Sequence, residues 1–262
     1  MQRLRTGMKW KDLVLNPGLQ RQVDDIGLWL QHHKDLMKDG NFSRRVKPGF
    51  IVLFVGPSGT GKSLTVGLLG KRFKKNVYRI GLGSVVSKYI TETEKNLSRI
   101  FDKAEKKDWI LFFDEADALF GKRTNIENGG DRYANQELLS FFFQKLENYR
   151  GLSIVSLTQN DIPQSESFNH FDSIIDFPLP GINERLTLWK SSLPSDLKVD
   201  PDLDWQHISE AYPMTGAEIV HVIQYASLKA LSRKQKRIVL QDILEGVNKV
   251  GVRNDEEYSV RG

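Results

Sequence analysis

A glycine-rich loop directly behind an apolar run constrains this chain more than any other feature. Residues 50–55 read Phe-Ile-Val-Leu-Phe-Val, and Gly56-Pro57-Ser58-Gly59-Thr60-Gly61-Lys62-Ser63 follows at once, which fits the pattern G-x-x-x-x-G-K-[ST]. Glycines let such a loop curl until successive backbone N–H groups face phosphate oxygens, and the helix behind it adds its positive end. The pattern therefore predicts a buried strand, a phosphate-binding loop and a helix, in that order.

Two side chains at the end of this loop have the chemistry of a nucleotide site. Lys62 is expected to reach the β- and γ-phosphates, and the Ser63 hydroxyl is expected to coordinate Mg²⁺. We predict that the nucleotide contacts extend over residues 56–64 and so include Leu64.

An acidic pair at the end of a second apolar run supplies the other half of such a site. The run Leu111-Phe112-Phe113 leads into Asp114 and Glu115. Asp114 is expected to hold Mg²⁺ through water, and Glu115 to polarise the attacking water. Asp117 is expected to be a charge at a helix N-terminus rather than a ligand.

Apolar runs that alternate with helical patterns predict an α/β fold, a parallel sheet with helices on both faces. Strands are expected at 50–55, 77–80, 109–113, 152–157 and 174–177. Helices are expected at 91–106, at 132–149 and from Pro17 until Gly40 stops the pattern. After Gly181 only helical patterns remain, at 183–193, 204–211, 216–231 and 240–250. We therefore expect a lead-in over 1–49, a nucleotide-binding body over 50–180 and a helical lid with a polar tail over 181–262.

Composition excludes several other kinds of protein. The chain contains no cysteine, so disulfide frameworks, cysteine-based zinc sites and thiol catalysis are ruled out. No apolar run approaches the roughly 18 residues that span a bilayer, and no secretory signal is visible. We expect a soluble, cytoplasmic protein without membrane contact. The net charge of +5 is too small to argue for nucleic acid by itself.

At this point the sequence resembles the AAA+ ATPases, and within them the classical AAA clade. The loop at 56–63, the segment 111–117 and Leu157-Thr158-Gln159-Asn160 occur in the order of that family. Residues 85–96 and 131–137 are most similar to AAA ATPases associated with contractile injection systems of bacteria. The resemblance implies a P-loop NTPase fold with ATP and Mg²⁺ as cofactors, and it implies that Asn160 orients the catalytic water.

The same resemblance implies a partner and an assembly. Lys88, Tyr89 and Ile90 match the first pore loop, which grips a polypeptide in the centre of a homo-oligomeric ring, and a hexamer is one expected size. Residues 121–131 match the second pore loop. By analogy the substrate would be the sheath of an injection system. From the residues alone, Tyr89 and Ile90 are equally suited to pack against the following helix.

The resemblance also implies a lid contact with the nucleotide. Gly216 and Ala217 lie where the lid helix of this clade meets the adenine or the phosphates. Gly216 also suits a helix N-cap, so its role stays open at this stage.

One departure from the family puts hydrolysis in doubt. Such rings complete each active site with a pair of arginines from the neighbouring subunit, and the corresponding positions here are Asn169 and His170. An arginine of this kind contributes roughly 10³–10⁵ in rate. Arg123 and Arg132 lie in segments that face a neighbour in related rings. The alternative is therefore a nucleotide-dependent scaffold that hydrolyses ATP weakly or not at all.

Two nucleic-acid functions are alternatives to the ATPase and to the scaffold. Residues 114–117 spell the Asp-Glu-Ala-Asp of RNA helicases, but the remaining chain is too short and too helical for their second domain. A DNA-related AAA+ loader is a further alternative because basic clusters occur at 71–75, 103–107 and 233–237. Such clusters are usually solvated helix faces, and no helix-turn-helix or zinc module accompanies them, so we do not expect nucleic acid as a partner.

Overall fold

The computed structural model describes residues 1–82, 90–120, 129–158, 165–233 and 237–251, with backbone only at 90, 91, 118, 129–135 and 165–167. The chain divides into two compact units. The first comprises Met1–Trp10, Gly18–Gly56 and Lys62–Phe177, and the second comprises Lys11–Pro17, Pro57–Gly61 and Pro178–Gly262.

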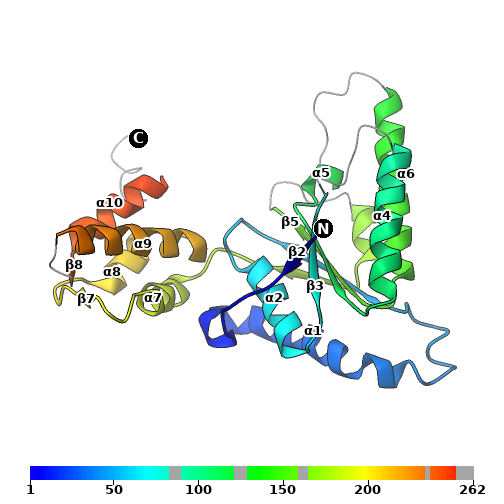
Figure 1. Ribbon diagram of the computed structural model, residues 1–262, viewed down its shortest axis with the longest axis horizontal. Coiled ribbons are helices and arrows are strands. Elements are labelled where there is room, and N and C mark those ends of the chain that lie inside the picture. Colours follow the sequence, from blue (N-terminus) through cyan, green and yellow to red (C-terminus); the bar gives the residue numbers. More distant parts are fainter. Residues whose placement is uncertain (83–89, 121–128, 159–164, 234–236, 252–262) are drawn as a thin grey trace. The chain divides into compact units, whose positions relative to one another are not determined.

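A six-stranded sheet forms the centre of the first unit, in the order β1-β3-β4-β5-β2-β6 (Figure 1). The strands are β1 (Gln2–Leu4), β2 (Phe50–Val55), β3 (Val77–Gly81), β4 (Ile110–Asp114), β5 (Leu152–Leu157) and β6 (Ser173–Asp176). All neighbours pair in parallel except β1, which runs antiparallel to β3. The predicted α/β P-loop fold class is confirmed. The short edge strand β1 was missed because three residues carry no periodic signal.

Helices cover both faces of this sheet, as the continuous apolar runs of its inner strands require. Figure 1 shows α4 (Ile90–Glu105) and α6 (Gly129–Asn148) on one side, with α1 (Pro17–Leu36) and α2 (Lys62–Arg72) on the other. Alternate residues of the strands, among them Leu53, Phe113 and Val155, form one buried cluster with residues of α4 and α6. The intervening residues, such as Val52, Phe54 and Ile154, are equally buried and point to the opposite face.

Helices dominate the second unit. They are α7 (Ile182–Ser191), α8 (Trp205–Ala211), α9 (Gly216–Ser232) and α10 (Leu240–Val250), and the two-residue strands β7 (Lys198–Val199) and β8 (Arg237–Ile238) pair in parallel beside them. These two strands correct the expectation that strands end at Gly181, since pairs this short leave no pattern. Trp189, Val222 and Ile243 belong to its buried core. None of the helices in the described ranges is long and apolar enough to span a bilayer.

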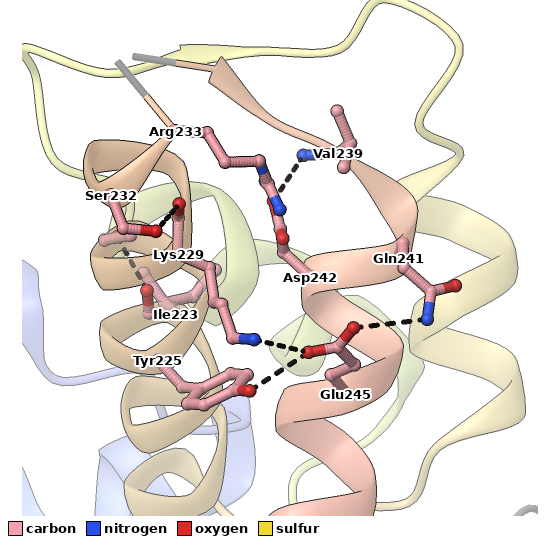
Figure 2. Close-up of polar contacts among 10 residues, drawn as sticks. Ile223, Tyr225, Lys229, Ser232, Arg233, Val239, Gln241, Asp242 and Glu245 are labelled. Carbon is pink, nitrogen blue, oxygen red and sulfur yellow. Dashed lines mark hydrogen bonds and ion pairs between the residues drawn. The ribbon is translucent and has the colours of Figure 1, made fainter. Parts of the chain in front are cut away.

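A polar network joins α9 to α10 (Figure 2). Asp242 is fully buried, and its Oδ2 accepts hydrogen bonds from the guanidinium of Arg233 and, at 3.2 Å, from the N–H of Val239. One helical turn further along, Glu245 accepts a hydrogen bond from the hydroxyl of Tyr225 at 3.0 Å and pairs with Lys229 at 3.1 Å. The two carboxylates therefore hold the neighbouring helices in register.

Candidate nucleotide site

The glycine-rich loop begins where three parallel strands end together. The N–H of Gly56 donates to the carbonyl of Leu157 at 3.2 Å, and the N–H of Phe177 donates to that of Val55 at 2.7 Å. The φ of Gly56 is +146°, and a Cβ on this residue would lie 2.1 Å from the carbonyl oxygen of Phe177. Only glycine fits this close approach, which lets the chain turn out of β2.

The middle of the loop, Pro57–Gly61, clusters with the second unit. Gly59 and Gly61 have φ values of +83° and +104°, which favour glycine. The carbonyl of Gly59 accepts a hydrogen bond from the N–H of Ala217 at 3.2 Å. Gly216 is the first residue of α9, because Thr215 forms the N-cap with a full capping box to Glu218. The structure thus brings Ala217 to the loop.

Lys62 supplies the positive charge of the loop sequence 56–63, and it is buried. It is 9% exposed, and its ammonium group donates to the carbonyl of Gly56 within the curl of the loop. Burial lowers the pKa of Lys62, and the carboxylates of Asp114 and Asp117 oppose this shift. Ser63 follows in α2 and is half-buried.

Asp114 ends β4 at the same edge of the sheet as this loop. It is 7% exposed, and one of its oxygens accepts a hydrogen bond from the hydroxyl of Ser156 on β5. Its other oxygen lies 2.7 Å from Nε of Arg79 on β3. Neighbouring strands on both sides therefore orient this carboxylate.

Glu115 differs sharply from Asp114 in exposure. Its side chain is 74% exposed, and its φ of +55° turns the chain out of the strand. One carboxylate oxygen lies 3.5 Å from Nη2 of Arg79. Arg79 thus contacts both acids. Sequence reasoning missed Arg79 and Ser156, since only the strand order places them beside Asp114.

Asp117 is the first residue of α5 (Asp117–Phe120), so its predicted place at a helix N-terminus is confirmed. Its carboxylate also accepts hydrogen bonds from the N–H and the hydroxyl of Thr158, both at 2.9 Å. This contact ties the start of α5 to the end of β5. The predicted Asn160 lies outside the described residues, two positions beyond Thr158.

The pore-loop residues Lys88 and Tyr89 also lie outside the described residues, and Ile90 is described only as the first backbone position of α4. Of the two positions where arginines were expected, Asn169 is exposed. Nδ1 of His170 lies 2.9 Å from a carboxylate oxygen of Glu147, and the His170 ring stacks on Phe143 with 4.0 Å between ring centroids. Its ring is therefore held against α6.

The side chains gathered here fit a magnesium nucleotide. A hydroxyl at Ser63 and a carboxylate at Asp114 are the hard oxygen ligands that Mg²⁺ takes, usually alongside water and phosphate oxygens. Because only glycine fits at position 56, the loop begins with a residue that has no side chain. Lys62 places a positive charge in the same cluster.

Part of the chain is similar to a known protein family. Residues 52–179 match the model of the ATPase family associated with various cellular activities (AAA). The match begins in β2 and ends just beyond β6, so it covers the loop, both acids and the strands that position them.

Curated relatives extend the similarity beyond that segment. A proteasome-activating nucleotidase of Methanosarcina mazei is 27% identical over 248 residues, which cover 92% of this chain and 58% of the relative. One from Aeropyrum pernix is 30% identical over 206 residues, covering 76% and 50%. The peroxisomal ATPase PEX6 of Pichia angusta is 28% identical over 237 residues, covering 86% and 20%. The chain thus spans about half the length of the nucleotidases and a fifth of the third protein.

Proposed function

Because residues 52–179 match the model of the AAA ATPase family, we propose that this chain binds ATP with Mg²⁺ and hydrolyses it. One observation carries the proposal: Asp114 lies close enough to act on the charge of Lys62, and Arg79 contacts both Asp114 and the exposed Glu115 that follows it. A buried acid suits metal binding, and an exposed one suits contact with water.

Each of these residues has a task in the proposed reaction. Lys62 binds the β- and γ-phosphates, while the N–H groups of Gly56 and residues 58–61 and the start of α2 at Ser63 and Leu64 surround them. Bound Mg²⁺ supplies charge neutralisation, held by Ser63 and through water by Asp114. Glu115 polarises the attacking water, which Asn160 helps to orient. Gly216 and Ala217 complete the nucleotide contacts.

We further propose a homo-oligomeric ring, with a hexamer as one expected size, that acts on a polypeptide. The support is the family resemblance at Lys88, Tyr89 and Ile90 together with the relatives named proteasome-activating nucleotidase. An injection-system sheath as the substrate rests on the resemblance alone, and none of the three relatives described above carries such a name. A cytoplasmic location is proposed on the same resemblance.

A specific observation favours a second candidate, a nucleotide-binding scaffold that hydrolyses ATP weakly or not at all. His170 is engaged by Glu147 and Phe143 of α6, so its imidazole is committed within its own subunit. An imidazole also lacks the planar, permanently charged fork of arginine. Two other arginines were expected to face a neighbouring subunit. Arg123 lies outside the described residues, and only the backbone of Arg132 is described.

The test is steady-state ATP hydrolysis across a protein-concentration series, with mass measurement in ATP and Mg²⁺. For the ATPase we expect turnover per subunit to rise as rings form. Glu115→Gln should lower that turnover by about 10²–10⁴-fold because it removes the general base, while ATP binding persists. Glu105→Gln is the matched control, since Glu105 is an exposed acid of α4 that pairs with Arg150.

Two results would decide against the ATPase. Tight ATP binding with negligible turnover at every concentration would establish the scaffold instead. Measurable turnover that Glu115→Gln leaves unchanged would show that another group activates the water, and the assignment of Glu115 would fail.

A further inference from the structure

An open pocket of about 350 Å³ lies beside the edge strand β1, within the first unit. Its lining residues come from β1, which pairs with β3, from α2 and from the segment between α2 and β3. Its polar lining consists of five cations together with a hydroxyl and an amide, and the lining contains no Asp or Glu. The residues that matter here are Arg3, Arg5, Lys71, Lys74, Lys75 and Asn76.

Four of these cations have no acidic partner in the part of the chain that the structure describes. Arg3 donates to the amide oxygen of Asn76, and Lys71 donates to the carbonyl of Met8 at 2.9 Å, so both bond to neutral groups. Neither Arg5 nor Lys74 has an ion pair among the described side chains. Cations crowded around one concavity repel each other, and this repulsion is lowered when an anion binds.

The nearest acid does not neutralise the pocket. Lys75 pairs with Asp108 at 2.6 Å, but Asp108 also pairs with Lys34 at 2.8 Å. One negative charge is therefore shared between two lysines. The lysines hold the pKa of Asp108 below its ordinary value even though burial opposes this, so the carboxylate is already committed.

Backbone geometry at Lys74 adds an independent observation. Its φ is +54°, and the N–H of Lys75 donates to the carbonyl of Gly70 at 2.9 Å, which is the left-handed helix ending that favours glycine. A lysine here holds a backbone conformation that its Cβ disfavours. The α2 C-terminus itself opposes an anion, but with only about half a charge against four unpaired cations.

We propose that this pocket binds a small anion that carries several phosphate groups, at a site separate from the nucleotide loop. Guanidinium forks and ammonium groups together suit the many oxygens of linked phosphates, whereas one carboxylate would balance a single cation. The volume lies near the lower end for ligand pockets, about 300–1,000 Å³, which favours a small ligand over a nucleic-acid strand. The proposal does not rest on ATP hydrolysis.

The test is calorimetric titration with tripolyphosphate in a Lys62→Ala background, which removes the main cation of the nucleotide loop. We expect one site that weakens as salt rises. Arg3→Gln, Arg5→Gln and Lys74→Gln combined should weaken it by at least about tenfold because three charged contacts are lost. The matched control combines Lys103→Gln, Lys106→Gln and Lys107→Gln, which removes the same charge from exposed residues of another basic cluster. The control should retain the affinity.

Several outcomes overturn the proposal. These are absence of binding, binding that survives the pocket substitutions, and an equal loss in the control. Tighter binding of a single-stranded oligonucleotide than of tripolyphosphate, at equal phosphate concentration, would also overturn it by identifying a nucleic-acid surface. Lys74→Gln alone, with its fold checked by circular dichroism, repeats the test if the triple variant fails to fold.

ATP in the same Lys62→Ala background distinguishes two sources of the phosphates, and either result supports the pocket. Tighter binding of ATP than of tripolyphosphate assigns a nucleotide's phosphate chain. Equal or weaker binding of ATP assigns a free phosphate chain.

Discussion

Two arginine–aspartate pairs in this molecule have the same chemistry and different surroundings. In the first unit, Arg79 meets Asp114, and in the second, Arg233 meets Asp242. Both arginines are about 40% exposed and both aspartates are buried. Burial and pairing of a carboxylate therefore do not reveal whether its role is chemical or structural.

Neighbouring groups make the difference. Asp114 has the hydroxyl of Ser156 and the charge of Lys62 near it, and the exposed Glu115 follows. Asp242 has one N–H, from Val239, besides Arg233. Asp114 can therefore exchange partners without losing all of them, whereas Asp242 depends on a single cation.

The largest effect is expected from Arg233→Gln. This change leaves a fully buried carboxylate without its cation, so we expect a lower unfolding free energy and a clearly lower urea midpoint, with the loss reduced because Arg233 is partly exposed. Urea denaturation measures the loss, and amide exchange should place it in α9 and α10. Adding Asp242→Asn should restore most of the stability because the stranded charge is removed. A loss that the second change does not relieve would contradict the pairing argument.

Asp114→Asn should act on the reaction instead. We expect turnover to fall about 10–100-fold, since an indirect metal contact is lost, with little change in the unfolding midpoint. Steady-state hydrolysis as a function of Mg²⁺ concentration measures this, and excess Mg²⁺ should recover part of the rate. A large loss of stability with unchanged turnover per folded molecule would make the two aspartates alike and end the contrast.

This contrast shows what the sequence can predict about the site. The motif spacing predicts Gly56, Lys62 and Asp114 as site residues, since each follows a local signal in the chain. Arg79 and Ser156 have no such signal because they reach Asp114 through the order β3-β4-β5. That order follows from how all strands pack together, and no short segment contains it.

The fold shows the same division between local and non-local information. Long apolar runs predicted β2 and β5, and a helical pattern predicted α10, each with the bounds that the structure has. The edge strand β1 and the pair β7 and β8 are two or three residues long, and they exist because a partner strand supplies their hydrogen bonds. Their formation depends on tertiary contacts that periodicity does not report.

Arg79→Gln is the matched counterpart of the Arg233 substitution, and we expect a smaller effect. The cost in unfolding free energy should stay below about 1 kcal/mol, since Arg79 is 40% exposed and Asp114 keeps Ser156 and Lys62. Urea denaturation of both variants under one set of conditions gives the comparison directly. Equal losses would show that the surroundings of the two aspartates do not matter.

The smallest effect concerns Glu245, a partly exposed acid of the same α9–α10 network. Hydrogen bonds, first from Lys229 and then from Tyr225 and Gln241, lower the pKa of Glu245 below its usual 4.5. Such a carboxylate stabilises the fold at pH values above 4.5, and this contribution is lost as the pH falls from there through the lowered pKa of the folded protein. Glu245→Gln should therefore lower the melting temperature at pH 6.5 by less than about 2 °C, and this difference should shrink steadily as the pH falls below 4.5.

Salt separates this surface contribution from the buried pair beside it. In about 1 M salt the Debye length is about 3 Å, so the effect of Glu245→Gln should nearly vanish. The effect of Arg233→Gln should largely persist, since Asp242 is fully buried and ions do not reach it. If salt removed both effects equally, Asp242 would behave as a surface charge, and its contrast with Asp114 would need a cause other than burial and partner number.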